Sequence, residues 1–301
     1  MPDSLYHYTT AAGLLGILEP LTNTDDLGLA IETTSVRSFS LWATDARYLN
    51  DSAELTFAAK ELGSAVIEQL DDLADDEPRK EILQHVAERI REGDFTTEDV
   101  TYTTHSQAAY VTCFCTDGDL LSQWRGYGAN GGGYSIEFDS RALEYLLVPA
   151  LRAGDAVVGH AIGSPLVQVN YGLDDEKLRE AAKLIVEGEP DSALFNMLSS
   201  LAQFKHEAFA EEDEWRIVAS RPTFYTPLRF RPGPTGGITP YIRLIRPQPV
   251  DDLTVIPSAI RSITVGPGSD QDLREEALRQ LLGQRGFLDV EVKRSKTTYK
   301  G

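Results

Sequence analysis

The sequence predicts an α+β domain with a helical insertion near residues 52–100. Two observations support this fold class. Short segments rich in β-branched and aromatic residues lie on both sides of this stretch, while the stretch itself has the apolar spacing of amphipathic helices. No repeat, low-complexity tract or long linker divides the chain. We therefore expect residues 1–301 to fold as a single domain.

The first elements are a strand, a short helix and a second strand. The strand contains "LYHYTT", residues 5–10, and residues 11–18 suit a helix capped by Thr9 or Thr10. A turn-rich stretch follows, and "SFSLWATD", residues 38–45, predicts the second strand.

The insertion is predicted to contain two solvent-facing helices, over residues 52–70 and 78–92. Residues 51–99 contain 15 acidic and 5 basic residues, so this segment alone carries about half of the net charge of −19. Such a charge pattern is typical of helices with one face in water.

The middle of the chain predicts strands and helices in alternation. A glycine-rich stretch, "GANGGGY", is predicted to join two strands, either as a simple turn or as a loop that contacts a ligand. The predicted elements are a strand at 108–117, a helical turn, the glycine loop and a strand within 120–139, a strand at 165–172, and helices at 174–188 and 191–212.

The next strand is "EEDEWRIVAS", whose alternation places Glu214, Arg216 and Val218 on one face and Trp215 and Ile217 on the other. The chain then closes with a strand–helix–strand unit. Its parts are predicted at 260–267, 270–284 and 287–294, with Gly286 ending the helix region.

The charge and the apolar pattern exclude several classes of function. A net charge of −19 repels nucleic acid backbones and anionic membranes, so nucleic acid contact is restricted to the local arginine patch of residues 221–250. That patch contains Arg221, Arg229, Arg231, Arg243 and Arg246 and no acidic residue. No apolar run approaches the roughly 20 residues that span a bilayer, and we expect a cytoplasmic protein. Cys113 and Cys115 share one face of a strand and cannot form a disulfide framework.

Several well-known site types are missing from the sequence. The five histidines lack the spacing of a zinc helix, so no metal is expected. The glycine loop lacks the lysine of a phosphate-binding P-loop, and no Gly-x-Ser-x-Gly elbow occurs. The remaining candidates are polar and aromatic residues at strand ends.

Glu212, Glu214 and Arg216 are the first candidates, because spacing of two residues places them on one strand face. Arg216 would hold one carboxylate while the other stays free to accept a hydrogen bond or a proton. The alternative interpretation is a solvated strand edge. His7 is a hydrogen-bonding group at the mouth of a cleft or else a packed histidine, with Tyr8 or Tyr48 offering an aromatic face.

A third cluster is "SQWRGYG", in which Trp124, Arg125 and Tyr127 would line a pocket for a nucleotide-like ligand. The alternative is an aromatic turn that only packs. If His7 faces a cleft, Tyr8 packs in the core, because successive strand residues point to opposite faces.

These motifs together resemble the bacterial family catalogued as domain of unknown function 2971, over nearly the whole chain. Asn50-Asp51 matches the family's Asn-Asp after a strand, and Trp124 with Tyr127 matches its Trp-x-x-Tyr. Glu212 to Arg216 matches its Glu-x-Glu-Trp-Arg, and Ser295 with Tyr299 matches its terminal Ser and Tyr.

The order of His7, an aromatic residue after the second strand and a glutamate on a late strand also resembles the His-Tyr-Glu layout of ADP-ribosyltransferases. This resemblance implies a mixed, mainly antiparallel sheet and NAD as the substrate. It implies that His7 contacts the adenosine-side ribose, that Tyr48 or Tyr127 stacks on nicotinamide, and that Glu214 or Glu212 holds the nicotinamide ribose. The further NAD contacts it implies come from Thr9, Asn50, Trp124, Arg125 and Arg216.

The resulting hypothesis is an NAD-dependent ADP-ribosyltransferase-like enzyme that cleaves the nicotinamide glycosidic bond and transfers ADP-ribose to an unknown acceptor. The role that we expect for such an enzyme is that of a bacterial toxin or phage-defence effector. The first alternative is a non-catalytic module that senses or binds a nucleotide. The second is a metal-independent nucleic-acid-processing enzyme that uses the arginine patch.

Overall fold

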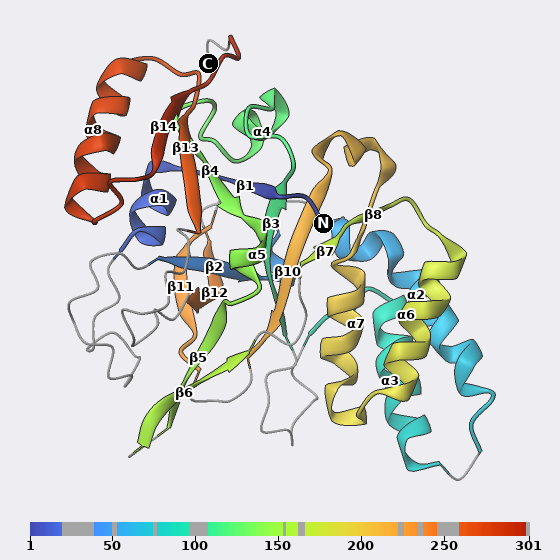
Figure 1. The fold of residues 1–301 in the computed structure, drawn as a ribbon. Helices are drawn as coiled ribbons and strands as arrows, with labels where there is room; N and C mark the ends of the chain where they lie inside the picture. Colours follow the sequence, from blue (N-terminus) through green and yellow to red (C-terminus); the bar gives the residue numbers. More distant parts are fainter. Residues whose placement is uncertain are drawn as a thin grey trace.

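The structure is a computed structural model, and it describes ten stretches of the chain. These are residues 1–19, 39–49, 53–74, 77–96, 108–152, 155–161, 166–221, 226–233, 237–245 and 259–298. Within them the chain forms a mixed α/β fold with a mainly antiparallel open sheet, as Figure 1 shows. The predicted α+β class and mainly antiparallel sheet are therefore confirmed.

In the described stretches, twelve strands belong to the main sheet, and two short strands pair separately. The strands are β1 (Ser4–Thr9), β2 (Ser40–Asp45), β3 (Ala109–Cys115), β4 (Tyr134–Asp139), β5 (Leu147–Arg152), β6 (Asp155–Ala161), β7 (Val167–Gln168), β8 (Asn170–Tyr171), β9 (Phe204–Lys205), β10 (Glu214–Ser220), β11 (Arg229–Pro232), β12 (Ile238–Ile245), β13 (Ile260–Val265) and β14 (Glu291–Arg294).

The helices lie on both sides of this sheet. They are α1 (Ala11–Ile17), α2 (Glu54–Leu70), α3 (Pro78–Arg91), α4 (Leu121–Gly126), α5 (Ser140–Leu143), α6 (Asp175–Glu187), α7 (Ala193–Leu201) and α8 (Gln271–Gln284). Helices α2, α3, α6 and α7 gather into one layer, on the right of Figure 1. None of the helices in the described stretches is long and apolar enough to cross a membrane.

Strand β3 is at the centre of the arrangement. Along one edge it pairs with β10 through its whole length, from Glu214 opposite Cys115 to Ser220 opposite Ala109. Its other edge is shared: Tyr6 of β1 lies opposite Cys115, and Thr44 of β2 lies opposite Val111. The two halves of the sheet, β1-β4-β13-β14 and β2-β12-β5-β6, therefore separate along this edge.

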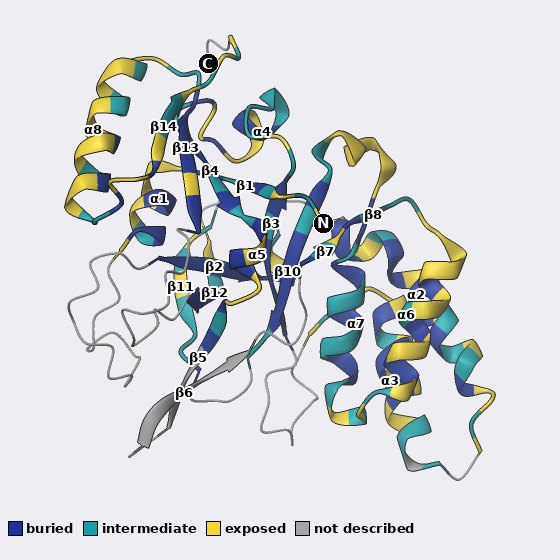
Figure 2. Cartoon of the chain, in the orientation of Figure 1, coloured by how far each residue is buried: buried dark blue, intermediate teal, exposed yellow. Residues whose placement is uncertain are grey.

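Two hydrophobic cores lie on opposite faces of the central strands. On β10, Ile217 packs into the core that includes α1 and α8, while Val218 packs into the core beneath α2, α3, α6 and α7. This alternation confirms the predicted faces of the strand. Figure 2 shows the buried strands between helices whose outer faces are exposed.

Most of the predicted elements are present. Thr10 caps α1 by accepting a hydrogen bond from the Gly13 amide at 3.2 Å. Helices α2 and α3 match the two predicted helices of the insertion, and Gly286 follows α8 in a left-handed conformation with φ of 75°. The final unit is a parallel β13–β14 pair joined by α8.

Two predictions are wrong in detail. The helix predicted over 191–212 ends at Leu201 of α7, and β9 and a 3₁₀ turn, Glu207–Glu212, follow it. The strand predicted at 165–172 is divided into β7 and β8, which pair with β10 and β9 respectively. The pairs β5–β6 and β11–β12 are elements that the sequence analysis did not predict.

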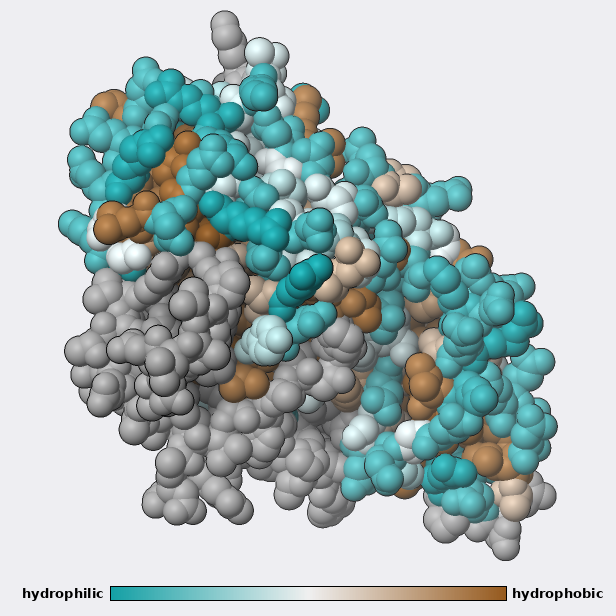
Figure 3. Space-filling model, in the orientation of Figure 1, coloured by the Kyte–Doolittle hydropathy of each residue, from teal (hydrophilic) through white to brown (hydrophobic). Residues whose placement is uncertain are grey.

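The surface over these elements is mainly hydrophilic in the view of Figure 3, with hydrophobic side chains near α8 and over the layer of α2, α3, α6 and α7. Exposed apolar residues on and after α8 include Leu273 and Leu288. Isolated residues of this kind are usual on a protein surface.

Candidate functional site

The predicted Glu214–Arg216 pair exists and is buried at the start of β10. Glu214 Oε1 accepts a hydrogen bond from Arg216 Nε at 2.7 Å, and Oε2 accepts one from Nη2 at 2.9 Å. Only 5% of Glu214 and 1% of Arg216 is exposed. This two-pronged pairing holds the carboxylate in one orientation.

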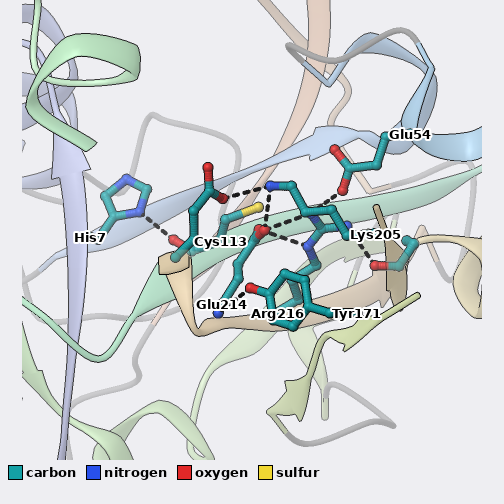
Figure 4. A network of polar contacts seen from close by, with 9 residues as sticks. His7, Glu54, Cys113, Tyr171, Lys205, Glu214 and Arg216 are labelled. Atoms are coloured by element: carbon teal, nitrogen blue, oxygen red, sulfur yellow. Dashed lines mark hydrogen bonds and ion pairs between the residues drawn. The ribbon is translucent and has the colours of Figure 1, made fainter. Parts of the chain in front are cut away.

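Lys205 of β9 joins a second carboxylate to the first, as Figure 4 shows. Its Nζ donates to Glu214 Oε2 at 2.8 Å and to Glu212 Oε2 at 2.7 Å. The expectation that one carboxylate stays free is therefore wrong. Glu212 also lies in the 3₁₀ turn before β10, not on the strand, and Asp213 between the two glutamates is left-handed with φ of 39°.

Arg216 also ties the helical layer to the sheet. Its Nη1 donates to the Ala202 carbonyl at 2.6 Å, and its Nη2 forms a short contact with the carboxylate of Glu54 at the start of α2. We call Glu54, Lys205, Glu212, Glu214 and Arg216 the ionic network. The three guanidinium nitrogens of Arg216 and the ammonium nitrogen of Lys205 all donate to protein groups. Arg216 is therefore placed to organise the network and not to meet a ligand phosphate.

The charges in the network set its protonation states. Burial alone would raise the pKa of Glu214, but the charges and hydrogen bonds of Arg216 and Lys205 outweigh it and lower the pKa to about 2. Burial dominates at Glu54, whose pKa is raised despite Arg216. The pKa of Lys205 is raised because the attraction of Glu214 and Glu54 outweighs its burial. Glu214 is therefore ionised at any physiological pH.

Two tyrosines flank the carboxylates. The Tyr171 hydroxyl accepts a hydrogen bond from the Glu214 amide at 2.7 Å, and burial raises the Tyr171 pKa to about 12. Tyr127, just after α4, is 36% exposed. Burial, the Cys113 thiol and the charges of Glu214 and Glu212 raise the Tyr127 pKa. A partly exposed aromatic ring thus lies near the outer carboxylate of the network.

Glu212 is the more accessible of the two predicted carboxylates. Its side chain is 13% exposed, whereas that of Glu214 is 6% exposed. The ionic network therefore reaches solvent at Glu212, and Glu214 lies behind it.

His7 occupies a different position. Its Nδ1 lies 2.9 Å from the Cys113 carbonyl, and its ring is 5.8 Å from that of Phe114. Tyr6 and Glu214 both lie opposite Cys115, so their side chains share one face of the sheet and His7, next to Tyr6, points to the other. The structure therefore does not bring His7 and Glu214 to one face, although both contact Cys113.

Several other predicted residues are packed in the core. Tyr8 is 6% exposed, as predicted, and its hydroxyl donates to the Asp117 carbonyl at 3.0 Å. Trp124 is fully buried and donates from Nε1 to Asp119 Oδ1 at 2.8 Å. Its ring lies edge-on to Tyr8 with 4.7 Å between centroids, which favours the interpretation of a packing turn.

The remaining predicted contacts are dispersed. Thr9 is 8% exposed at the end of β1, Tyr48 is 47% exposed after β2, and Arg125 is exposed on α4. Asn50 lies outside the described residues. Of the two candidate tyrosines, Tyr127 is the one that the structure places near Glu212 and Glu214.

The glycine loop is a well-bonded turn. Gly131 and Gly133 accept hydrogen bonds from the amides of Gly268 and Gly266, at 2.8 and 2.9 Å. Ala129, Asn130 and Gly131 all have positive φ values, so the loop needs left-handed backbone at this turn.

The predicted arginine patch is divided between different environments. Arg243 is 7% exposed and donates to the Ser40 hydroxyl at 3.0 Å, whereas Arg229 and Arg231 lie on β11. Arg246 lies outside the described residues.

A surface groove of about 640 Å³ lies between α2, α3 and α6. It is lined by both acidic and basic side chains near the C-terminal end of α2, such as Asp72 and Arg79. Glu54 is at the opposite end of that 17-residue helix, about 24 Å away at 1.5 Å per residue. The groove is therefore separate from the ionic network.

Sequence reasoning missed Lys205, Glu54 and Tyr171. Lys205 falls within the helix predicted over 191–212, and Glu54 falls at the start of the predicted solvent-facing helix over 52–70. One signal in the sequence could have indicated such partners. Glu214 and Arg216 are charged residues on a strand that is otherwise mostly apolar, and a buried charge requires a partner.

No curated protein and no solved structure matches the chain. One protein-family model does match, over residues 123–217, and it is described as "Protein of unknown function (DUF2971)". The matched segment contains Trp124, Tyr127 and the Glu212–Arg216 motif, whereas Asn50, Asp51, Ser295 and Tyr299 lie outside it. This match supports the assignment, made from the sequence motifs, of the chain to the DUF2971 family.

Proposed function

We propose that this chain is an NAD-dependent ADP-ribosyltransferase-like enzyme that acts at the outer end of the ionic network. The observation that carries the proposal is the Lys205-bridged pair of Glu212 and Glu214 with Tyr127 beside it. In this proposal NAD is a substrate, and the acceptor of ADP-ribose is a nucleophile of unknown class. The free thiols of Cys113 and Cys115 fit a reducing compartment, so we place the reaction in the cytoplasm.

The reaction breaks the bond between C1′ of the ribose and the nicotinamide nitrogen. Nicotinamide leaves with the bonding electron pair, and the ribose acquires oxocarbenium character. The acceptor's nucleophilic atom then bonds to C1′ and loses its proton to solvent or to a carboxylate. A fixed, ionised carboxylate stabilises the positive charge that develops on the ribose. Glu212 provides that charge, and Lys205 holds it in place.

We assign different roles to the two glutamates. Glu212 reaches solvent and is the residue that contacts the ribose hydroxyl. Glu214 has both carboxylate oxygens engaged by Arg216 and Lys205, so it is a positioning residue that fixes Lys205 and thereby Glu212. Tyr127 offers its ring to nicotinamide. His7 has no role in this step, because it points to the opposite sheet face.

The test is nicotinamide release. Purified protein is incubated with NAD and cell extract as the source of acceptor, and nicotinamide is measured by chromatography. We expect release, and a loss of about 100-fold or more in Glu212→Gln, in the range for removal of one charge-stabilising group. Glu211→Gln is the matched control, because Glu211 is an exposed carboxylate on the same turn.

Absence of nicotinamide release from the wild-type protein would overturn the proposal, and so would equal rates for wild type and Glu212→Gln. Tyr127→Leu should raise KM for NAD more than it lowers kcat if the ring only binds nicotinamide.

A second candidate is a non-catalytic nucleotide-binding module. Two observations favour it. Both carboxylate oxygens of Glu214 already accept hydrogen bonds from protein groups, and Trp124 is buried. This function predicts that NAD or another nucleotide raises the melting temperature without any turnover. Stabilisation without nicotinamide release would select this candidate, and release would exclude it.

A further inference from the structure

Strand β3 has a fork along one edge, where β1 and β2 separate. Cys115 lies between Tyr6 of β1 and Glu214 of β10, and Val111 lies between Thr44 of β2 and Val218 of β10. Between these two pairings, side chains replace the strand ladder: His7 bonds the Cys113 carbonyl, and the Thr112 hydroxyl donates to the Trp42 carbonyl at 2.9 Å.

The fork contains a guanidinium without a carboxylate. Arg231 of β11 is half-buried, and its Nη2 donates to the Thr44 hydroxyl at 2.8 Å. Its guanidinium carbon lies 5.6 Å from the centroid of the Trp42 ring. Within the described stretches, Arg231 forms no ion pair, and burial lowers its pKa.

Three other partly or fully buried arginines have a carboxylate partner, whereas Arg274, also half-buried, donates instead to the carbonyls of Gly131 and Gly266. Arg47 pairs with Asp45 at 2.6 Å, Arg89 with Asp94 at 2.9 Å, and Arg216 with Glu214 at 2.7 Å. A half-buried cation without a counter-ion costs free energy, and a cation–π contact offsets only part of it. An anionic ligand bound to Arg231 would therefore offset the rest of this free-energy cost.

The neighbouring groups are polar and fixed. The Trp42 ring stacks on Tyr241 with 4.9 Å between centroids, and it lies against Gly16 of α1, where any Cβ would overlap it. Trp42 Nε1 is buried and has no hydrogen-bond acceptor among the described residues. Unpaired buried donors are rare in folded proteins.

His7 supplies the opposite kind of group. Because Nδ1 faces the Cys113 carbonyl, it carries the proton, and Nε2 is an acceptor in the neutral ring. Burial and the charge of Arg231 lower the pKa of His7, which keeps the ring neutral. A cation together with an acceptor suits a phosphate monoanion, which carries both negative charge and a proton. A carboxylate has no proton to donate.

We propose that the fork, formed by His7, Trp42, Thr44 and Arg231, binds a phosphate group, with Arg231 as its counter-ion. The ligand class is a small phosphate or a phosphate monoester. This site lies along the edge of β3 opposite β10, so it is separate from the ionic network and does not depend on the proposed NAD reaction.

The test is calorimetric titration of the full chain with inorganic phosphate at constant ionic strength. We expect binding that Arg231→Gln weakens about 10- to 100-fold, the value of one charge-assisted contact. Arg229→Gln is the matched control, with the same charge change on the same strand, and should stay within about 2-fold of wild type. Glu212→Gln should bind phosphate normally, which separates this test from that of the NAD reaction.

Thr44→Val is a second variant, which removes the hydroxyl that orients the guanidinium and should weaken phosphate several-fold even if Arg231→Gln does not fold. Acetate at the same ionic strength should bind more weakly than phosphate. Three results would overturn the proposal: no phosphate binding by wild type, equal binding by wild type and Arg231→Gln, or equal affinity for acetate and phosphate.

Discussion

Cys113 connects the two candidate sites through different atoms. Its carbonyl accepts from His7 on the fork side, and its thiol lies beside Glu214 in the ionic network. Burial and the Glu214 charge raise the pKa of the thiol well above its usual value, so it stays protonated and can donate to the carboxylate. Cys113 is thus a structural donor and not a nucleophile.

Glu214 gives a prediction on pH. Its folded pKa of about 2 lies below the ordinary 4.5, so its stabilising effect is complete above pH 4.5 and is lost as the pH falls toward 2. Urea unfolding should show Glu214→Gln less stable than wild type at pH 6, by at most about 3 kcal/mol. The difference should shrink between pH 5 and pH 2. A difference that stays constant over this range would contradict the assigned ion pairs.

Residue pairs close in sequence were predictable, and distant partners were not. The Glu214–Arg216 pair follows from strand alternation, and the burial of Tyr8 follows from its position next to His7. Lys205 and Glu54 come from other elements, and no local pattern brings them to Glu214. Tertiary packing alone places them there.

At the scale of elements, locally periodic segments were predicted well and long-range strand pairs poorly. Helices α2, α3 and α8 have clear apolar spacing. Strands β11 and β12 contain Pro232 and Pro240, which interrupt the alternation by which a strand is recognised. Strand β9 is only two residues long and exists because it pairs with β8, so its sequence reads as a continuation of helix α7.

The contact between α1 and β2 gives a prediction at this scale. A methyl group at Gly16 would overlap the Trp42 ring, so Gly16→Ala should lower the free energy of unfolding by about 1–3 kcal/mol and weaken phosphate binding at the fork. Gly126→Ala is the control, since Gly126 likewise lies in the last turn of a short helix but has no atom within 4 Å of an added Cβ. Chemical denaturation should rank Gly126→Ala at or above wild type. Equal stability of the two variants would contradict the packing of Trp42.

For the whole molecule, the split along β3 and the two cores explain why the candidate sites are separate. One core joins the sheet to α1 and α8, and the other joins it to the four-helix layer. The ionic network lies where β10 meets the four-helix layer, and the fork lies where the two halves of the sheet separate. Sequence reasoning gave the α+β class, but it could not give the split, which depends on two strands sharing one edge.

The net charge of −19 gives a prediction for the whole chain. Asp71 and Glu92 occupy the C-terminal caps of α2 and α3, and Asp72 follows Asp71, so three exposed acids oppose the helix dipoles. Raising NaCl from about 0.02 to 0.2 M screens this repulsion and should raise the melting temperature.

The triple variant Asp71→Asn, Asp72→Asn, Glu92→Gln should be more stable than wild type at low salt, by about 0.3–1 kcal/mol for each site. It should also respond less to NaCl, because fewer repulsions remain to be screened. Replacing three exposed acids near helix N-termini, Glu81, Asp175 and Glu176, with their amides should lower stability, since these charges favour the dipole. If both triple variants changed the melting temperature in the same direction, net charge alone would govern stability, and the placement of acids along the helices would have no effect.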